Sequence, residues 1–441
     1  MKDVLLKVIK NMTKQQAEDF VYKSYIKASK YQNYHAKDSE KRRNDLTFDL
    51  LHEKSKTPCT VVTGSKGKGS VANMISQILQ SEYTVGLMTS PHIVDFCERF
   101  QVNGGKISDQ DFIKHMSLIQ DEIDALDSSI PENVCISPMG IQAYLALNYF
   151  ESCNTGFNIF ECGKGAKFDD VNNIKHDYAV INSIFLEHTR ELGETLEEIA
   201  EDKSHVITGE QKCVYVAEQS PEALEVIKNR AHRLHVPLKI YGTDFYADNI
   251  QYTNEGMLFD IIIEGQVYPN ILIPLLGEHQ AKNCALAFAL CREILGNLDL
   301  NRIKNNLYKI NWPGRMEVIS KEPFILLDAC INSAACENVI KVLNYLNIDS
   351  ATIIVGIPDD KDYQGVVKAI KEKSSSIILT KSQNPHYVFT QNQQYELQKE
   401  GIETLWTESV PEALNLAKEK NRPIVILGTT SVIAEVKSLY A

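Results

Sequence analysis

The sequence contains no long apolar segment. Across its 441 residues no hydrophobic run approaches the roughly 20 residues that a membrane-spanning helix requires. The first residues, Met1-Lys-Asp-Val-Leu-Leu-Lys, also lack the apolar core of a targeting signal. We therefore expect a cytoplasmic protein that has no membrane partner.

Paired cysteines and an excess of basic residues are missing as well. The 10 cysteines form no Cys-x-x-Cys pair and no regular framework, so reduced thiols are expected rather than disulfides or a zinc site. The 46 basic residues are outnumbered by 58 acidic ones, which gives a formal net charge of −12. Such a charge disfavours sequence-independent binding to nucleic acid.

One loop has the composition of a phosphate-binding site. An apolar run that begins at Cys59 leads into Gly64-Ser-Lys-Gly67-Lys68-Gly69-Ser70. The next residues, 71–80, place apolar side chains at i, i+3, i+4, i+7 and i+8, which predicts a helix that packs on a sheet.

A strand, a glycine-rich loop and a helix in this order predict a nucleotide site, although an ordinary glycine-rich turn is the alternative. Loop N–H groups and the helix N-terminus attract an anion. Lys68 would reach the outer phosphates, and Ser70 would face a magnesium ion or a phosphate oxygen. The spacing differs from the common P-loop, in which four residues separate the first glycine from Gly-Lys-Ser/Thr.

The remaining pattern predicts an α/β protein with two domains, because a single core rarely grows beyond about 250–300 residues. Apolar strands alternate with amphipathic helices, which predicts a doubly wound, mostly parallel sheet with helices on both faces. A β-rich stretch with two hairpin turns is expected at residues 239–274, and a helical, charged segment at residues 1–55. A second alternating set with about five strands begins after Trp312-Pro313-Gly314. We therefore expect a P-loop ATPase domain at 1–311 and a smaller Rossmann-like domain at 312–441.

The loop resembles the ATP site of the Mur ligase superfamily, in its folylpolyglutamate synthase and dihydrofolate synthase branch. Further motifs resemble that branch in order and approximate spacing, and together they span most of the chain. They are Thr89-Ser90-Pro91-His92 with Glu98-Arg99, Glu161-Cys-Gly163-Lys-Gly165 with Asp169 and Asn172, Leu186-Glu187-His188-Thr189 with Leu192-Gly193, Glu201-Asp-Lys203, Gly277-Glu-His279-Gln280 with Asn283, Pro313-Gly314-Arg315-Met-Glu317, and Asp328.

Three residues with oxygen or nitrogen ligand atoms are candidates for a magnesium site: Ser90, Glu161 and His188. Each follows a predicted strand, and the carboxyl ends of parallel strands line the ligand crevice of an open sheet. Magnesium takes hard donors and completes its shell with phosphate oxygens and water. The resemblance implies the same three positions. Taken singly, they would be a turn residue, a surface carboxylate and a structural histidine.

The resemblance also implies roles for residues that spacing alone does not single out. Lys203, on a predicted helix at 195–207, matches a lysine that is carbamylated in related ligases and then holds a second magnesium ion. A carbamate requires a neutral amine, which burial and nearby cations favour. Asn283, Arg315 and Asp328 match positions that bind ATP, and Lys68, His188, Lys203 and Arg315 are the expected catalytic residues.

An amide ligase that works through an acyl phosphate is the function that the resemblance implies. It would join an amino acid, L-glutamate, to a folate-like carboxylic acid, and we expect a monomer. The family's Leu-Gly-Gly-Arg is Lys164-Gly-Ala-Lys167 here, its Asp-Gly-Ala-His-Asn-Pro is Asp328-Ala-Cys-Ile331-Asn-Ser333, and its Phe-Glu is Met139-Gly140.

These departures leave two alternatives open, a ligase for a non-folate acid and a nucleotide-binding homologue without ligase activity. A kinase is disfavoured because His-Arg-Asp and Asp-Phe-Gly are absent.

Overall fold

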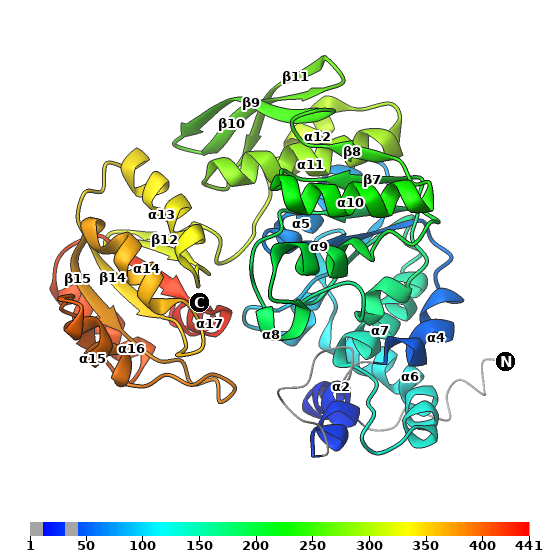
Figure 1. Ribbon diagram of the computed structural model, residues 1–441, viewed down its shortest axis with the longest axis horizontal. Helices are drawn as coiled ribbons and strands as arrows, with labels where there is room; N and C mark the ends of the chain where they lie inside the picture. Colours follow the sequence, from blue (N-terminus) through cyan, green and yellow to red (C-terminus); the bar gives the residue numbers. More distant parts are fainter. Residues whose placement is uncertain (1–11, 31–42, 441) are drawn as a thin grey trace.

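The structure is a computed structural model that describes residues 12–30 and 43–440 (Figure 1). It contains two α/β units, which lie side by side in Figure 1, and a small antiparallel sheet at the upper edge of the view. The α/β fold class expected from the sequence is confirmed.

The first unit is built on an eight-stranded sheet with the order β4-β3-β2-β5-β1-β6-β7-β8. Strands β2, β5, β1, β6, β7 and β8 pair in parallel. Strands β3 and β4 form an antiparallel edge next to β2. The bounds are β1 Cys59–Thr63, β2 Val85–Met88, β3 Phe100–Val102, β4 Gly105–Lys106, β5 Phe157–Glu161, β6 Tyr178–Ile181, β7 Cys213–Val216 and β8 Leu238–Ile240.

Helices cover both faces of this sheet. The side chains of Val61 and Val62 point to opposite faces, because successive residues of a strand alternate, and they belong to two separate apolar clusters. On one face lie α5 Lys68–Leu79, α11 Glu278–Leu295 and α12 Leu300–Leu307. On the other lie α2 Lys14–Ser29, α4 Phe48–His52, α6 Asp109–Ser129, α7 Pro138–Ser152, α9 Leu196–Ser204 and α10 Pro221–Leu234.

Short elements complete the first unit. They are α8 Thr189–Leu192 and the 3-10 helices η1 Asn44–Thr47, η2 Phe96–Arg99 and η3 Asp170–Asn173. The helical prediction for residues 1–55 is confirmed at α2 and α4, and residues 1–11 and 31–42 lie outside the described part of the chain.

The predicted β-rich stretch forms the three-stranded sheet β11-β10-β9. Its strands are β9 Phe245–Thr253, β10 Gly256–Ile263 and β11 Gln266–Ile273, and all pairs are antiparallel. Both predicted hairpin turns are present, between β9 and β10 and between β10 and β11. Alternate residues such as Met257, Phe259 and Ile261 are buried against α11, so one face of this sheet packs on the first unit.

The second unit has a six-stranded sheet with the order β12-β13-β17-β14-β15-β16. Its strands are β12 Glu317–Lys321, β13 Phe324–Asp328, β14 Ala351–Gly356, β15 Ser374–Leu379, β16 Leu405–Trp406 and β17 Ile424–Gly428. One face carries α13 Ser333–Tyr345, α14 Tyr363–Ile370 and α15 Asn392–Lys399, and the other carries α16 Val410–Glu419 and α17 Thr430–Ser438. The 3-10 helix η4 Lys371–Lys373 precedes β15.

The sheet has one strand more than the five or so that the sequence predicts. The edge strand β12 is half exposed and polar, and β16 has only two residues, so neither has a strong apolar pattern. The division of the chain at residue 312 stays a prediction, although all six strands of the second sheet follow it.

Two global properties complete the description. In the described part of the chain, no helix combines the length and apolarity that crossing a bilayer would need. All 10 cysteines are free thiols, and all of them except Cys153 are buried.

Candidate active site

The glycine-rich loop connects the end of β1 to the start of α5, as the sequence predicts. Gly64 and Gly67 have φ angles of +134° and +73°, which side chains other than glycine rarely adopt. A Cβ at Gly67 would also lie 2.6 Å from Nδ2 of Asn182. The Asn182 amide donates to the Lys66 carbonyl at 2.9 Å and to Oδ1 of Asn283 at 3.1 Å, and so fixes the loop against α11.

Two side chains of the loop are placed to receive an anion and its metal. The Ser70 side chain is buried, and its Oγ has no hydrogen-bond partner among the residues that the structure describes. A buried hydroxyl without a partner is costly unless a ligand satisfies it. Lys68 Nζ donates to the Gly64 carbonyl at 3.1 Å, which leaves its other two donor positions for a phosphate.

Glu161 and Ser90 meet at the carboxyl ends of the neighbouring strands β5 and β2. Oε2 of Glu161 accepts a hydrogen bond from the Ser90 amide at 2.9 Å. Burial raises the pKa of Glu161, and the nearby charge of Lys68 opposes this shift. A cation beside this carboxylate would compensate for its burial, so Glu161 with the orphaned Ser70 hydroxyl has the donor chemistry that magnesium requires.

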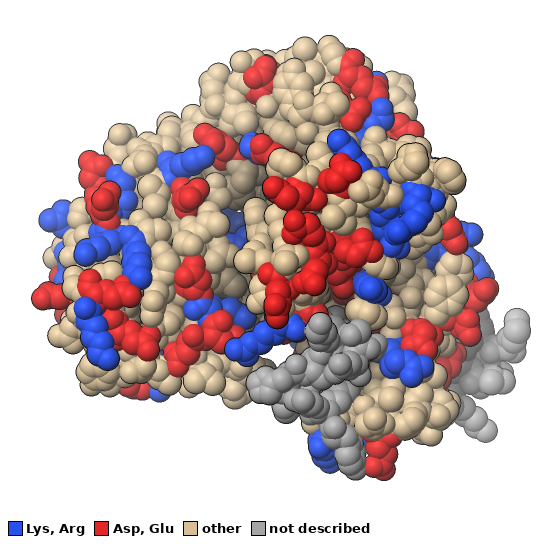
Figure 2. Space-filling view, in the orientation of Figure 1, with Lys and Arg blue, Asp and Glu red and all other residues tan. Residues whose placement is uncertain are grey.

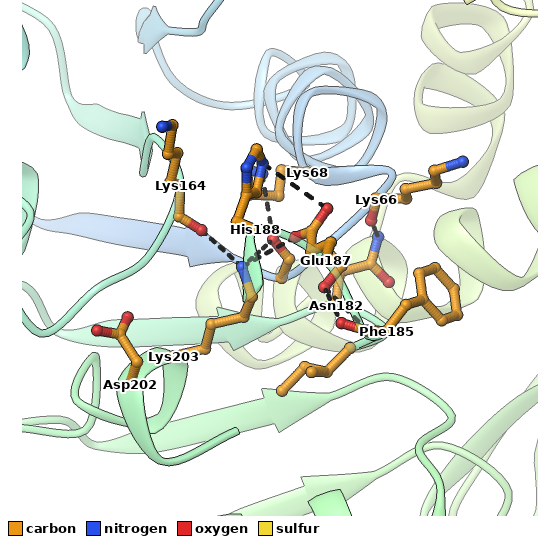
Figure 3. Close-up of polar contacts among 12 residues, drawn as sticks. Lys66, Lys68, Lys164, Asn182, Phe185, Glu187, His188, Asp202 and Lys203 are labelled. Carbon is orange, nitrogen blue, oxygen red and sulfur yellow. Dashed lines mark hydrogen bonds and ion pairs between the residues drawn. The ribbon is translucent and has the colours of Figure 1, made fainter. Parts of the chain in front are cut away.

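Lys203 is completely buried, with no exposed surface. Its Nζ donates to the carbonyl oxygens of Gly64 at 3.1 Å and Lys164 at 2.6 Å, and it pairs with Oε1 of Glu187 at 3.2 Å (Figure 3). Burial lowers the pKa of Lys203 to about 8; the Lys68 charge adds to the shift and Glu187 opposes it. Lys203 therefore lies directly behind the phosphate loop, because it shares the Gly64 carbonyl with Lys68.

His188 lies on the Glu187 side of this arrangement. It precedes α8 with a left-handed φ of 47°, and its Nε2 is 4.0 Å from a Glu187 oxygen (Figure 3). Burial lowers the pKa of His188.

The predicted metal ligands therefore fall into two groups. Glu161 and Ser90 lie together, whereas His188 and Lys203 are connected through Glu187. Among the described residues, the one close group of three acidic, cysteine or histidine ligand atoms is elsewhere, at Asp95, Cys97 and Asp109. Lys14 pairs with both of those carboxylates at 2.8 Å, so they already have a cation.

The second unit contributes the charged groups on the far side of the loop. Asp328 ends β13, and its Oδ2 accepts the Met316 amide at 2.9 Å. Burial raises the pKa of Asp328, while the positive charge of Arg315 opposes the shift. Figure 2 shows a hollow between the two units, and acidic side chains line the rim that α8 and α9 form.

Lys164 and Ile331, which depart from the family pattern, and Gly165, which keeps it, all have structural partners. Lys164 Nζ pairs with Glu191 at 2.9 Å. A Cβ at Gly165 would lie 2.1 Å from an Asp202 oxygen, which also accepts the Ala166 amide, so this turn depends on glycine. Ile331, where the family has histidine, packs against the apolar cluster of the second unit.

Three residues of the site, Asn182, Glu187 and Lys66, were not among the predicted site residues. Asn182 directly follows β6, and the rule of strand ends that selected Glu161 could have selected it. Glu187 lies in one of the motifs quoted for the resemblance. No sequence pattern singles out Lys66, because its partner Asn332 is 266 positions away in the chain.

Comparison with known proteins identifies the family of this chain. The profile of the Mur ligase middle domain matches residues 62–291, which is more than half of the chain. The chain belongs to this family. The match begins in β1 and ends in α11, so it includes the phosphate loop, Glu161, His188, Lys203 and Asn283.

Individual relatives extend the similarity to nearly the whole chain. The dihydrofolate synthase/folylpolyglutamate synthase of Bacillus subtilis is 29% identical over 406 residues, which cover 90% of this chain and 93% of the relative. The folylpolyglutamate synthase of Lacticaseibacillus casei is 26% identical over 386 residues, or 85% and 88% of the two chains.

The solved structure of Mycobacterium tuberculosis folylpolyglutamate synthase, complexed with ADP and AMPPCP, superposes with a TM-score of 0.87 at 21% identity. It covers 96% of this chain and 99% of that one, which shows a shared fold.

Proposed function

We propose that this protein is an ATP-dependent ligase that joins L-glutamate to a folate-type carboxylic acid. The observation that carries the proposal is the arrangement at the phosphate loop. The charges of Lys68 and Arg315 act on Glu161, which accepts the Ser90 amide, and Asp328 lies at the end of β13 in the second unit. In the same loop the buried Ser70 hydroxyl has no hydrogen-bond partner among the described residues. Similarity to folylpolyglutamate and dihydrofolate synthases over most of the chain supports the same reaction class.

The reaction would proceed in two steps. The γ-phosphoryl group of ATP is transferred to a carboxylate oxygen of the acid, which yields ADP and an acyl phosphate. The amino group of glutamate then attacks the acyl carbon, the C–N bond forms, and phosphate leaves while the nitrogen loses a proton. Lys68 and Arg315 stabilise the charge on the phosphoryl oxygens, and the loop amides orient them. Asn283 and Asp328 would hold the nucleotide.

Magnesium would be held by Glu161 with Ser90 and Ser70, and by His188 once the site is loaded. When bound, it neutralises phosphate charge. The carboxylate and hydroxyl donors fit this ion, since magnesium prefers oxygen ligands. The carbamate at Lys203 is a further part of the proposal, and the lowered pKa of about 8 supports it because a fraction of the amine is neutral near pH 7.

Lys203 also has a plainer role available, because its charged form is satisfied by two carbonyl oxygens and Glu187. A Lys203→Ala protein distinguishes the two roles. We expect low activity that acetate or formate partly restores, since a small carboxylate can replace the carbamate oxygens. Inactivity that no carboxylate restores, with no acid-labile mass gain on the native protein, would point to the ammonium form.

The test of the function measures phosphate release from ATP with a panel of pterin and non-pterin acids, each with and without L-glutamate. The expected result is release that needs both a pterin acid and glutamate, together with a product of the summed mass. A Lys68→Ala variant should lose about a hundredfold in turnover, whereas Lys212→Ala, at a lysine whose side chain is 64% exposed, should match the wild type.

Turnover of non-pterin acids alone would favour a ligase with another acid substrate. The departures from the family pattern at Lys164 and Ile331 leave this alternative open. ATP binding without turnover of any acid would instead indicate a nucleotide-binding homologue. A cytoplasmic, monomeric protein without a nucleic-acid partner remains our expectation.

A further inference from the structure

The phosphate loop contains a second lysine that the proposed chemistry leaves unused. Lys66 lies between Gly64 and Gly67, and its backbone carbonyl accepts the Asn182 amide at 2.9 Å. Its side chain does not turn back toward the loop as that of Lys68 does. Instead its Nζ donates to Oδ1 of Asn332 in the second unit, at 2.9 Å.

Asn332 is the N-cap of α13. The same Oδ1 atom accepts the Ala335 amide at 2.9 Å and so satisfies one of the free N–H groups at the helix start. A cation at a helix N-terminus faces the positive end of the helix dipole. Lys66 therefore does not serve to stabilise α13 by charge, and its position needs another reason.

The helix α13 is also where other side chains of the first unit and the small sheet contact the second unit. Lys341 pairs with Glu278 of α11 at 3.2 Å, and the ring of Tyr345 stacks on Tyr252 of β9 at 4.6 Å. Of these contacts along α13, the one at Asn332 is the one that begins in the phosphate loop. It lies four residues after Asp328, which ends the preceding strand β13.

The charges around Lys66 belong to both sides of the hollow. Burial lowers its pKa, and the nearby charges of Asp328 and Glu187 oppose this shift, whereas Arg315 adds to it. Lys66 thus lies among the groups that the proposed reaction would bring together.

We propose that Lys66 is a positioning residue that ties the phosphate loop to the N-terminus of α13 and so couples the position of the second unit to the state of the loop. The proposal rests on the proposed function. Groups of the second unit such as Asp328 reach the nucleotide only when the units are close, and a tie that starts in the loop favours this closed arrangement.

The test uses the full-length protein with Lys66→Met, Asn332→Ala, their double variant and Asn332→Asp. Methionine keeps the length of the side chain and removes the donor. Aspartate keeps both the cap and an acceptor for Lys66. Lys341→Met is the matched control, because Lys341 lies on the same helix and its replacement removes the ion pair with Glu278 of α11 without touching the loop.

We expect Lys66→Met to lower kcat about tenfold, as the loss of a hydrogen bond to a charged donor in the closed state would. Binding of a non-hydrolysable ATP analogue should change less than about threefold, because Lys68 and the loop amides remain. Asn332→Ala should lower kcat similarly, the double variant should be no worse than either single one, and Asn332→Asp and Lys341→Met should remain near wild type.

Independent effects of Lys66→Met and Asn332→Ala that multiply in the double variant would overturn the proposal. So would an equal loss of analogue binding and turnover in Lys66→Met, which would mean that Lys66 contacts phosphate directly.

Amide hydrogen exchange separates this proposal from the function itself. In the wild type, the ATP analogue should protect residues 328–336, and Lys66→Met should remove this protection without changing that of β1. If the wild type turned over no acid, the proposed function would fail, yet the exchange result would still decide whether the tie exists. Equal protection in both proteins would show that it does not.

Discussion

Replacing Lys203 by methionine tests the charge state of the buried amine behind the phosphate loop. In the folded protein, burial lowers the pKa of Lys203 from 10.5 to about 8. In the unfolded chain the amine titrates near its ordinary value. Between pH 8 and pH 10.5 the unfolded chain therefore binds a proton that the native state has lost, and the stability of the wild type rises with pH over this window.

The size of the effect follows from the same two values. A change of pKa from 10.5 to about 8, at about 1.4 kcal/mol for each pH unit, amounts to about 3 kcal/mol. Below pH 8 both states are protonated and the native state bears this whole cost. Methionine does not titrate. The free energy of unfolding of the wild type, relative to Lys203→Met, should therefore rise by about 2 kcal/mol between pH 7 and pH 9.5.

The assay is urea unfolding in buffers free of carbon dioxide, followed by tryptophan fluorescence. The chain has 2 tryptophans, and Trp312 packs against the core of the first unit, so a Trp406→Phe background reports that unit alone. Lys212→Met is the control, because the ion pair with Asp177 raises the pKa of Lys212 and moves its titration above this window.

A difference between wild type and Lys203→Met that is constant from pH 7 to pH 9.5 would refute the reasoning. It would mean that Glu187 and the two carbonyl oxygens compensate the buried ammonium completely. The neutral amine that a carbamate requires would then be scarce at physiological pH.

Three further predictions concern the phosphate loop and the candidate metal ligands. Gly67→Ala should abolish nucleotide binding in calorimetric titration, because a Cβ would lie 2.6 Å from Asn182 Nδ2 at a φ of +73°, and unchanged affinity would contradict the loop geometry. Lys68→Ala should lower turnover about a hundredfold with an unchanged melting temperature, and near-normal activity would exclude this loop as the catalytic phosphate site. Glu161→Ala and His188→Ala should each need about tenfold more magnesium for half-maximal activity, and wild-type metal dependence in both would show that the assignment is wrong.

The parts of the fold that the sequence predicts well are those with a strong apolar period. The helix after the phosphate loop and the buried strands of both units have such a period, and they lie where the pattern places them. The two-residue strand β16 and the exposed edge strand β12 have none, since edge strands bury little side-chain area. Their existence depends on backbone pairing with neighbours, which a single segment does not reveal.

Within the site, the sequence around Lys203 does indicate its burial, although the usual solvation of lysines on helices argues against it. A lysine on a helix is ordinarily solvated, and for that reason only the resemblance singled it out. Yet Ile199 and Lys203 are four positions apart on α9, so both lie on the same face of the helix, and both are completely buried. A lysine on the apolar face of an amphipathic helix predicts a buried amine with specific partners, and this argument needs no relative.

Lys66 is the opposite case, because no local pattern could have predicted its contact. Its neighbours in sequence are glycines and polar residues, and a lysine in such a segment is expected to be exposed to solvent. Its partner belongs to a helix cap whose own sequence signal, an asparagine before an amphipathic helix, is complete without it. The bond between them arises only when the two units are placed together. Residues that couple domains are therefore the ones that sequence patterns miss, since their chemistry is satisfied by a partner that neither local segment specifies.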